Sequence, residues 1–240
     1  EIPDKFHDFM DTWLNTHPEW QFIVWTDEKI NWPLRNQALM HQADTYAELS
    51  DLVRLEVVER FGGVYIDTDF EALQAIDELV APYEFFVGVE KDLATVVSGR
   101  DGEDTEAWVC PSIFGAAPHN PVVRALIDGL PHQVAENLGK DPNHKTGPYY
   151  WSNIYDSARA CALADKDACQ IGDVRDGDVR LEASYTLHHH IAAGRAKVFP
   201  RSIFYPYGWW EQERAGNKFE GAYAVHHWQK NWGGGWKQEL

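Results

Sequence analysis

The chain has 240 residues, 44% of them hydrophobic, which is enough to build the core of one or two domains; we expect a single domain over residues 1–240. Its formal net charge of -17 argues against a nucleic-acid backbone or an anionic membrane surface as partner, because both attract clustered Lys and Arg. An anionic substrate would have to be held locally, by a metal ion or a few cations.

Three cysteines, Cys110, Cys161 and Cys169, are too few for a disulfide framework and lack the paired spacing of a zinc site. We interpret them as free thiols of a reducing compartment and expect a cytoplasmic protein; a disulfide between Cys161 and Cys169 is the alternative. No run approaches the ~20 apolar residues that span a bilayer, so we expect no transmembrane segment in these residues. No signal peptide is visible, although the chain does not begin with Met and an upstream segment could have been removed.

The first quarter of the chain predicts a helix, a strand and a second helix. Residues 6–14 place Phe6, Phe9, Met10 and Leu14 on one side of a helix. The apolar run at 22–25, FIVW, predicts a buried strand between polar flanks. A polar and apolar pattern after it predicts another helical stretch.

The next helix carries the clearest terminal signals. Ser50 can cap its N-terminus, and Asp51 favours the positive end of its dipole. Two glycines at 62–63 can end it. A short strand at 64–66 then leads directly to Asp67.

Helix and strand signals continue to alternate, which indicates an α/β domain. We expect strands at 84–90 and 107–116, helices beginning near 121 and 147, and a turn-rich loop at 172–180. The last third is rich in loop and aromatic residues and suits a wall over a site. We place the three histidines at 188–190 on the surface or in a loop.

Two aspartates, Asp67 and Asp69, follow the short strand, at the edge of the sheet where ligands of α/β folds bind. Side chains alternate along an extended backbone, so both carboxylates would lie on one side. Two hard oxygen donors suit Mg²⁺ or Mn²⁺, which can also bind phosphate oxygens. For an isolated Asp-x-Asp sequence, an acidic turn that caps a helix is the favoured alternative.

The sequence SDLVRLEVVERFGGVYIDTDF at 50–70 resembles the signature of glycosyltransferase family 32, the DXD sugar-binding-region family. This family includes the yeast initiating α-1,6-mannosyltransferase and, more distantly, the glucosylating domains of large clostridial toxins. The matching residues are Ser50, Asp51, Arg54, Gly62, Gly63, Tyr65, Asp67, Thr68 and Asp69. Later blocks also resemble the family, at 19–28, 146–148, 204–206 and 224–232.

Three departures limit the match. The family usually opens with a strand of the form IPKxIHxIW, which is not seen here, so the nucleotide base is not assigned. Pro111 stands where we expect an asparagine, and Asn231 stands where the family usually has serine before tryptophan.

The resemblance implies a GT-A-like fold, a Rossmann-related mixed sheet flanked by helices, with an aromatic, loop-rich C-terminal region. It implies metal-dependent transfer of a hexose with retention of configuration. The donor would be a UDP- or GDP-hexose, and the acceptor a hydroxyl of a glycan, a lipid-linked molecule or a protein.

Asp51 and Arg54 lie three residues apart on one helix and can present a carboxylate and a guanidinium to one site. The carboxylate can accept hydrogen bonds from sugar hydroxyls, and the guanidinium can donate to hydroxyl or phosphate oxygens. The resemblance assigns both to the donor sugar. The alternative is an i,i+3 ion pair worth only ~0.2–0.5 kcal/mol.

The remaining roles follow from the resemblance. Asp67 would contact the ribose or donor sugar, and Asp69 would ligate Mn²⁺ or Mg²⁺, so that the catalytic set is Arg54, Asp67 and Asp69. His226 and Asn231 would be further metal ligands. Tyr65 and Trp232 would be further donor contacts, with Trp232 favoured over Trp228. We expect His227 to pack against neighbouring side chains and not to bind the ligand.

Two other functions remain open. A phosphoryl-transfer enzyme of the haloacid dehalogenase type also places Asp-x-Asp after an apolar strand, with Asp67 as nucleophile, but it expects threonine where Glu71 stands. It also leaves Asp51 and Arg54 unexplained. The second is a sugar-binding module without catalytic activity, against which the intact carboxylates argue.

Overall fold

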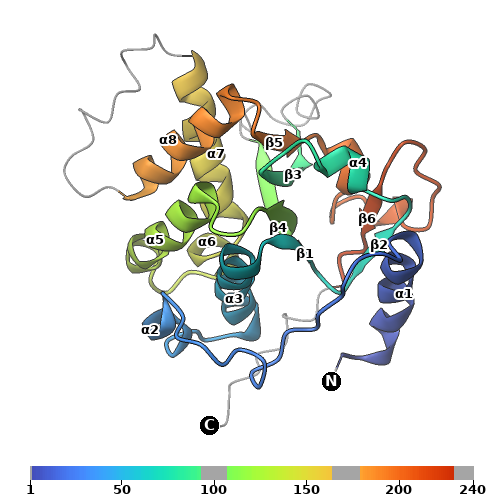
Figure 1. Cartoon of the computed structure of the whole chain (residues 1–240), viewed down its shortest axis with the longest axis horizontal. Coiled ribbons are helices and arrows are strands. Elements are labelled where there is room, and N and C mark those ends of the chain that lie inside the picture. Colours follow the sequence, from blue (N-terminus) through green and yellow to red (C-terminus); the bar gives the residue numbers. More distant parts are fainter. Residues whose placement is uncertain (1, 93–106, 164–178, 230–240) are drawn as a thin grey trace.

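The computed structural model describes residues 2–92, 107–163 and 179–229, and they form a mixed α/β structure (Figure 1). The helical elements are η1 (Asp4–Phe6), α1 (His7–Thr16), α2 (Gln37–Met40), α3 (Tyr46–Phe61), α4 (Asp77–Val80), α5 (Pro121–Glu136), α6 (Pro142–Lys145), α7 (Pro148–Leu163), α8 (Val179–Ala192), α9 (Arg201–Phe204) and η4 (Gln212–Arg214). The strands are β1 (Gly63–Ile66), β2 (Phe70–Ala72), β3 (Phe85–Lys91), β4 (Trp108–Ala116), β5 (Ala196–Phe199) and β6 (Ala224–His226).

Four strands form the main sheet in the order β1-β4-β3-β5, and β2 pairs with β6 in a separate ribbon. β4 runs antiparallel to both β1 and β3, whereas β3 and β5 are parallel. The β3–β4 register shifts between the pairs Val87–Phe114 and Gly88–Cys110, beside Pro111, which has no N–H to offer a ladder. The expected mixed sheet flanked by helices is confirmed.

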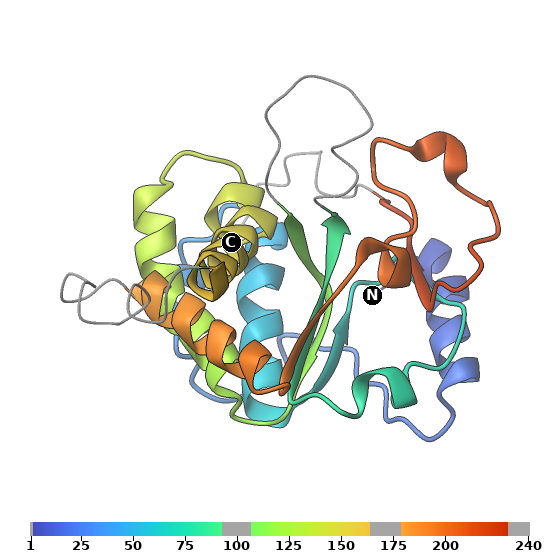
Figure 2. The same cartoon turned by 90° about the horizontal axis from the view of Figure 1, so that it is seen from above.

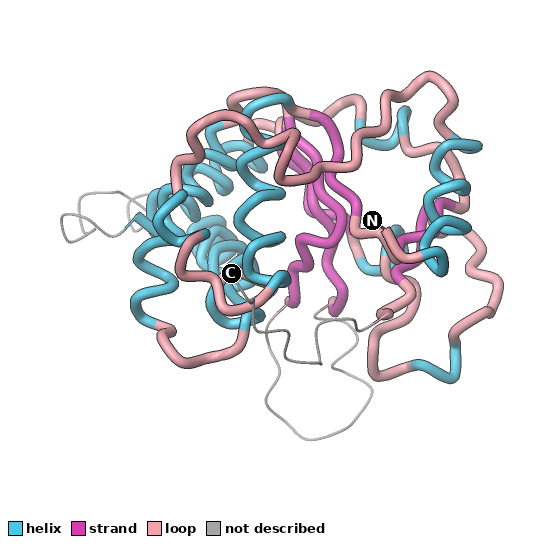
Figure 3. The backbone as a smooth tube through the Cα atoms, turned by 90° about the horizontal axis from the view of Figure 1, so that it is seen from below, coloured by secondary structure: helices cyan, strands magenta, loops and turns pink. Residues whose placement is uncertain are grey.

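The sheet is covered on both faces, as the views along its edge show (Figures 2 and 3). On one face, helices α3, α5, α7 and α8 enclose a core centred on Leu55, Phe114 and Ile127. On the other face, α1, α9 and the β2–β6 ribbon enclose a second core centred on Phe70, Ile113 and Phe204. Packing in the two cores fixes the positions of α3 and of the β2–β6 ribbon beside the end of β1, where the aspartates lie.

Helix α3 begins one turn earlier than the sequence analysis predicted. Its N-cap is Thr45, whose side chain accepts a hydrogen bond from the N–H of Glu48, and not Ser50. The Thr45-x-x-Glu48 spacing is the usual start signal of a helix, and it precedes the weaker signal at Ser50. At the other end, Gly62 has φ 68° and lies against Pro118, so both backbone and space require glycine there.

The strand predicted at residues 22–25 is wrong. Phe22, Ile23 and Val24 lie outside helices and strands, are exposed, and pair with no strand in the described part of the chain. An apolar run becomes a strand only where another strand takes up its backbone hydrogen bonds. The helix predicted at 6–14 is present, but its buried side chains are Phe6 and Trp13.

The last third is more regular than predicted. Residues 179–180, expected in a loop, begin α8, and β5 joins the main sheet. The histidines at 188–190 lie in α8. His190 is buried, and its Nδ1 atom lies 2.9 Å from the Thr186 carbonyl oxygen, within hydrogen-bond distance. Of the aromatic residues expected to form a wall over a site, Tyr205 and Trp228 pack in the second core with Ala224 of β6.

Two further expectations concern the cysteines and membrane spans. Cys110 is free and buried, but Cys161 is disulfide-bonded, so the interpretation of all cysteines as free thiols is wrong. Sequence spacing does not reveal pairing, which depends on distance in the fold. Within the ranges that the structure describes, no helix is both long and apolar enough to cross a bilayer.

Candidate functional site

The two aspartates lie in the turn that joins β1 to β2. The N–H of Asp67 still bonds to Ser112 on β4, and the N–H of Phe70 closes the turn on the Asp67 carbonyl. The chain therefore turns between the aspartates, and the alternation of a continuous strand does not apply to them. The two carboxylates nevertheless lie close to each other, because the turn redirects the chain into β2.

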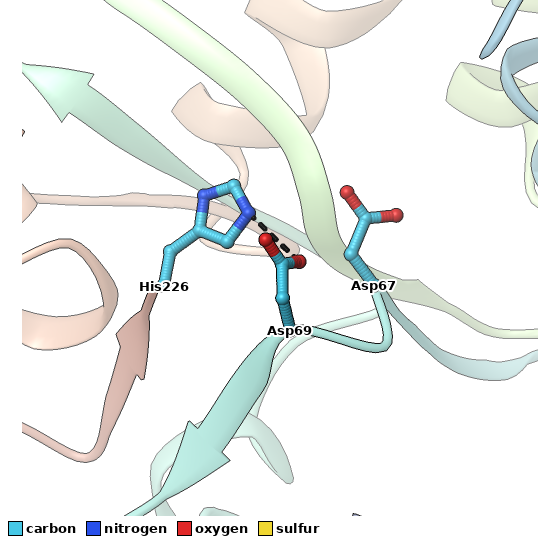
Figure 4. A group of neighbouring side chains, drawn as sticks. All are labelled: Asp67, Asp69 and His226. Atoms are coloured by element: carbon cyan, nitrogen blue, oxygen red, sulfur yellow. Dashed lines mark hydrogen bonds and ion pairs between the residues drawn. The ribbon is translucent and has the colours of Figure 1, made fainter. Parts of the chain in front are cut away.

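Pairing of β2 with β6 adds a histidine to the aspartates. Phe70 lies opposite His226 in this ribbon, so the residue after Asp69 faces the histidine directly. The His226 Nε2 atom lies 3.1 Å from Asp69 Oδ1 (Figure 4). The imidazole stacks on the Phe70 ring. One ligand atom from each of Asp67, Asp69 and His226 falls within 4.8 Å of the others.

Asp69 is held in its ionised form. Burial alone would raise the pKa of this carboxyl, but the His226 ring and the N–H of Gln229, 2.8 Å away, outweigh burial and lower it. An ionised carboxylate, a second carboxylate and an imidazole nitrogen make a donor set that suits Mn²⁺ or Mg²⁺. These three residues fit a divalent ion.

A second group of side chains surrounds Arg54. Its guanidinium lies 3.0 Å from Asp51 Oδ1 and 3.6 Å from Asp67 Oδ1 and donates to the Pro111 carbonyl at 3.0 Å. The same guanidinium stacks over the Tyr65 ring, whose hydroxyl donates to Asp67 Oδ1 at 2.6 Å. Helix α3 is thus bound to the turn of the aspartates through one cation.

Asp51 is almost completely buried within this group. Its other carboxylate oxygen accepts a hydrogen bond from the Thr146 hydroxyl at 2.7 Å. Burial raises the pKa of Asp51 to about 6, although Arg54 and Thr146 both act to lower it. Gly147 leaves room for this contact, since a Cβ there would lie 3.3 Å from Asp51 Oδ2.

Apart from Thr146 and Gly147, these groups line one cavity of about 1240 Å³. Its polar lining contains Asp51, Arg54, Asp67, Asp69, Glu90 and His226. Its apolar lining comes mainly from α1, from residues 22–25 and from α3 and β1. The volume is sufficient for a nucleotide sugar, since drug-sized ligands occupy about 300–1,000 Å³.

The structure brings together most of the residues that the sequence analysis selected. Asp51, Arg54, Tyr65, Asp67, Asp69 and His226 all line the cavity. Asn231 and Trp232 lie outside the described residues. The less favoured Trp228 also lines the cavity, with its ring 4.1 Å from His226, and His227 packs against Phe9 as expected.

Two residues escaped the sequence analysis. Thr146 was seen only as part of a block, yet it holds Asp51. Glu90 was seen only as the end of a strand, yet it is buried and lines the cavity. The available sequence signal for Glu90 was its place as a charged residue at the end of a mostly apolar strand.

Comparison with known proteins agrees with this geometry. Residues 3–86 match the family described as "Glycosyltransferase sugar-binding region containing DXD motif". Inositol phosphoceramide mannosyltransferase 3 of Schizosaccharomyces pombe is 23% identical over 241 residues, which cover 95% of this chain and 56% of that protein. Mannosyl phosphorylinositol ceramide synthase SUR1 of Saccharomyces cerevisiae is 29% identical over 138 residues, 55% of this chain and 32% of that protein.

The chain thus spans about half, or less, of the length of these curated relatives. Among solved structures, the PaToxG glycosyltransferase aligns with a TM-score of 0.35 and 18% identity, over 66% of this chain and 47% of that one. The resemblance found in the sequence is confirmed: residues 3–86 match the sugar-binding region of the DXD glycosyltransferases, and 95% of the chain aligns with the Schizosaccharomyces pombe mannosyltransferase.

Proposed function

We propose that these 240 residues act as one glycosyltransferase domain, which moves a hexose from a nucleotide-diphosphate sugar to an acceptor hydroxyl. The observation that carries the proposal is the convergence of two sets of groups on one cavity. Asp67, Asp69 and His226 form the first set, and the pair Asp51 and Arg54 forms the second. A metal-binding group beside a sugar-binding pair is what transfer from a sugar diphosphate requires.

The first set of residues would hold Mn²⁺ or Mg²⁺. Bound there, the ion would supply Lewis-acid stabilisation to the leaving diphosphate. In a chain with a net charge of -17, such local positive charge also answers how an anionic donor is held.

The second set orients the donor. The Arg54 guanidinium is held by Asp51, Asp67 and the Pro111 carbonyl and lines the cavity, so it would meet the donor in a fixed orientation. Tyr65 holds Asp67 in one orientation through its 2.6 Å hydrogen bond. In the reaction, the bond from the anomeric carbon to the diphosphate oxygen breaks, a glycosidic bond to the acceptor oxygen forms, and the acceptor's proton passes to the departing diphosphate.

The relatives suggest which donor and acceptor to examine first. They are named as mannosyltransferases of inositol phosphoceramide, so we propose mannose as the hexose and an inositol-bearing lipid headgroup as one acceptor class. Retention of configuration is part of the proposal on the strength of the family resemblance.

A donor screen tests the proposed function. The protein is incubated with GDP-mannose, UDP-glucose or UDP-galactose, each with Mn²⁺, Mg²⁺ or EDTA, and released nucleotide and free sugar are measured. We expect one donor to be cleaved with a divalent ion and none with EDTA. Binding without cleavage would indicate a sugar-binding module, and phosphate release from p-nitrophenyl phosphate would indicate a phosphoryl-transfer enzyme.

A further inference from the structure

One buried carboxyl in the cavity wall has no role in the site described so far. Glu90 lies near the end of β3 and is 5% exposed. It belongs neither to the Asp67, Asp69 and His226 group nor to the contacts of Arg54. Its side chain lines the same cavity as both.

The packing around Glu90 indicates where it faces. The β3–β4 register is irregular between Val89 and Lys91, so strand alternation does not place Glu90, but its hydrogen-bond partner Cys110 belongs to the second core. Arg201 and Lys91 act on Glu90 with their positive charges, and His226 of the ribbon is also close enough to influence it. Glu90 therefore approaches the ligand space from the side opposite to α3, which carries Asp51 and Arg54.

Glu90 differs from the other buried acids that the structure describes. Glu48 pairs with Lys145, Asp51 with Arg54 and Glu59 with Arg124, and Glu56 accepts the N–H of Asn36. For Glu90 the hydrogen-bond partner is the thiol of Cys110, which is a weak donor. Burial accordingly raises the pKa of Glu90 to about 7.

A carboxyl group that is buried with so weak a partner retains most of its hydrogen-bonding capacity, and burying such a group costs free energy. That cost is offset when a ligand supplies hydroxyl groups. We propose that Glu90 is a specificity-determining contact of the proposed transferase and that its carboxyl group hydrogen-bonds to a hydroxyl of the transferred hexose. The nucleotide part of the donor does not reach it. This inference rests on the proposed function.

Comparing a nucleotide sugar with its bare nucleotide tests the inference. Binding of GDP-mannose and GDP, and of UDP-glucose and UDP, is measured by calorimetry with saturating Mn²⁺ for the wild type, Glu90→Gln and Glu90→Ala. The Gln variant preserves shape, so it should fold even where Ala leaves a void. Glu56→Gln is the matched control, because Glu56 is equally buried but does not line the cavity.

For whichever nucleotide sugar the wild type binds, Glu90→Ala should weaken its binding by about ten- to a hundredfold, and Glu90→Gln should weaken it by less. The affinity of the variants for the bare nucleotide should stay within about twofold of the wild-type affinity. The control should bind both ligands as the wild type does. Equal binding of the nucleotide sugar by all variants would overturn the role of Glu90, and so would parallel losses for sugar and nucleotide. A wild type that binds neither nucleotide sugar would remove the proposed function itself, and the role of Glu90 with it.

Discussion

Acidic side chains that line the same cavity are treated in opposite ways by the fold. On the turn between β1 and β2, Asp69 receives hydrogen bonds from His226 and the Gln229 N–H, and its pKa is lowered. On α3 and β3, burial raises the pKa of Asp51 to about 6 and that of Glu90 to about 7.

The difference indicates a division of roles. A carboxylate that is stabilised as an anion can bind a metal ion at neutral pH, whereas carboxyls that are desolvated suit hydrogen bonds to uncharged hydroxyls. The turn would therefore bind the diphosphate through an ion, and the buried carboxyls would bind the sugar. The predictions below change the turn, the buried carboxyls or a residue that joins or supports them.

The largest effect is expected for Asp69→Asn. This change removes the anion while preserving its size, so donor cleavage should fall by roughly a hundredfold or more, since each ~1.4 kcal/mol of lost stabilisation costs a factor of ten. Steady-state cleavage of GDP-mannose or UDP-glucose with Mn²⁺ measures it, with Asp8→Asn on the exposed face of α1 as control. Full activity in the variant would remove the metal-binding role of the turn.

Arg54→Lys tests the link between Asp51 on α3 and Asp67 in the turn. Lysine retains the charge but loses the planar fork that bridges Asp51, Asp67 and the Pro111 carbonyl, so turnover should fall roughly ten- to a hundredfold. Arg60→Lys on the same helix is the control, because Arg60 lies outside the cavity lining. If Arg54→Lys were as active as that control, Arg54 would have only a structural role, as the partner of Asp51 and Asp67.

Thr146→Val removes the hydroxyl that donates to Asp51 without changing the shape of the side chain. That hydrogen bond lowers the pKa of Asp51, so its loss should raise the pKa further and move the acid limb of the pH–activity profile to higher pH. At pH 7 we expect a roughly three- to tenfold loss of donor cleavage. An unchanged acid limb would mean that Asp51 does not need to be ionised.

The smallest effect concerns stability. The pKa of Glu90 is about 7 in the folded chain against an ordinary value of 4.5, so the folded state binds its proton more tightly than the unfolded chain. Stability should therefore fall as pH rises from about 4.5 to about 7. Glu90→Gln removes this dependence, and in EDTA its Tm should exceed the wild-type Tm by roughly a few °C at pH 8 and by less at pH 5. A difference that is the same at both pH values would contradict the raised pKa.

Local signals allowed most of the segment from α3 through β1 to Asp67 to be predicted. The helix, the paired glycines, the short strand and Asp67 follow one another in the chain, and each element is specified by its own residues. The helix start was displaced because Thr45 and Glu48 form the stronger cap. Asp51 and Arg54 were correctly placed together because helix geometry alone brings residues three apart to one face.

Features that depend on distant pairing could not be predicted from local patterns. Phe22–Val24 have the composition of a strand but no strand partner among the described residues, so the prediction there was wrong. The β2–β6 ribbon joins residues about 150 positions apart, and only the family resemblance pointed to His226. Glu90 shows its importance only through burial and the weakness of its partner.

The central claim is that a divalent ion held by Asp67, Asp69 and His226 binds the diphosphate of the donor. Calorimetry of GDP and UDP with the wild type and with Asp69→Asn, each in Mn²⁺ and in EDTA, tests it directly. For the wild type we predict that one nucleotide binds at least about tenfold more tightly with Mn²⁺, because carboxylates otherwise face phosphates, and that Asp69→Asn loses most of this gain. Equal affinity of the wild type for both nucleotides with and without Mn²⁺ would contradict the claim.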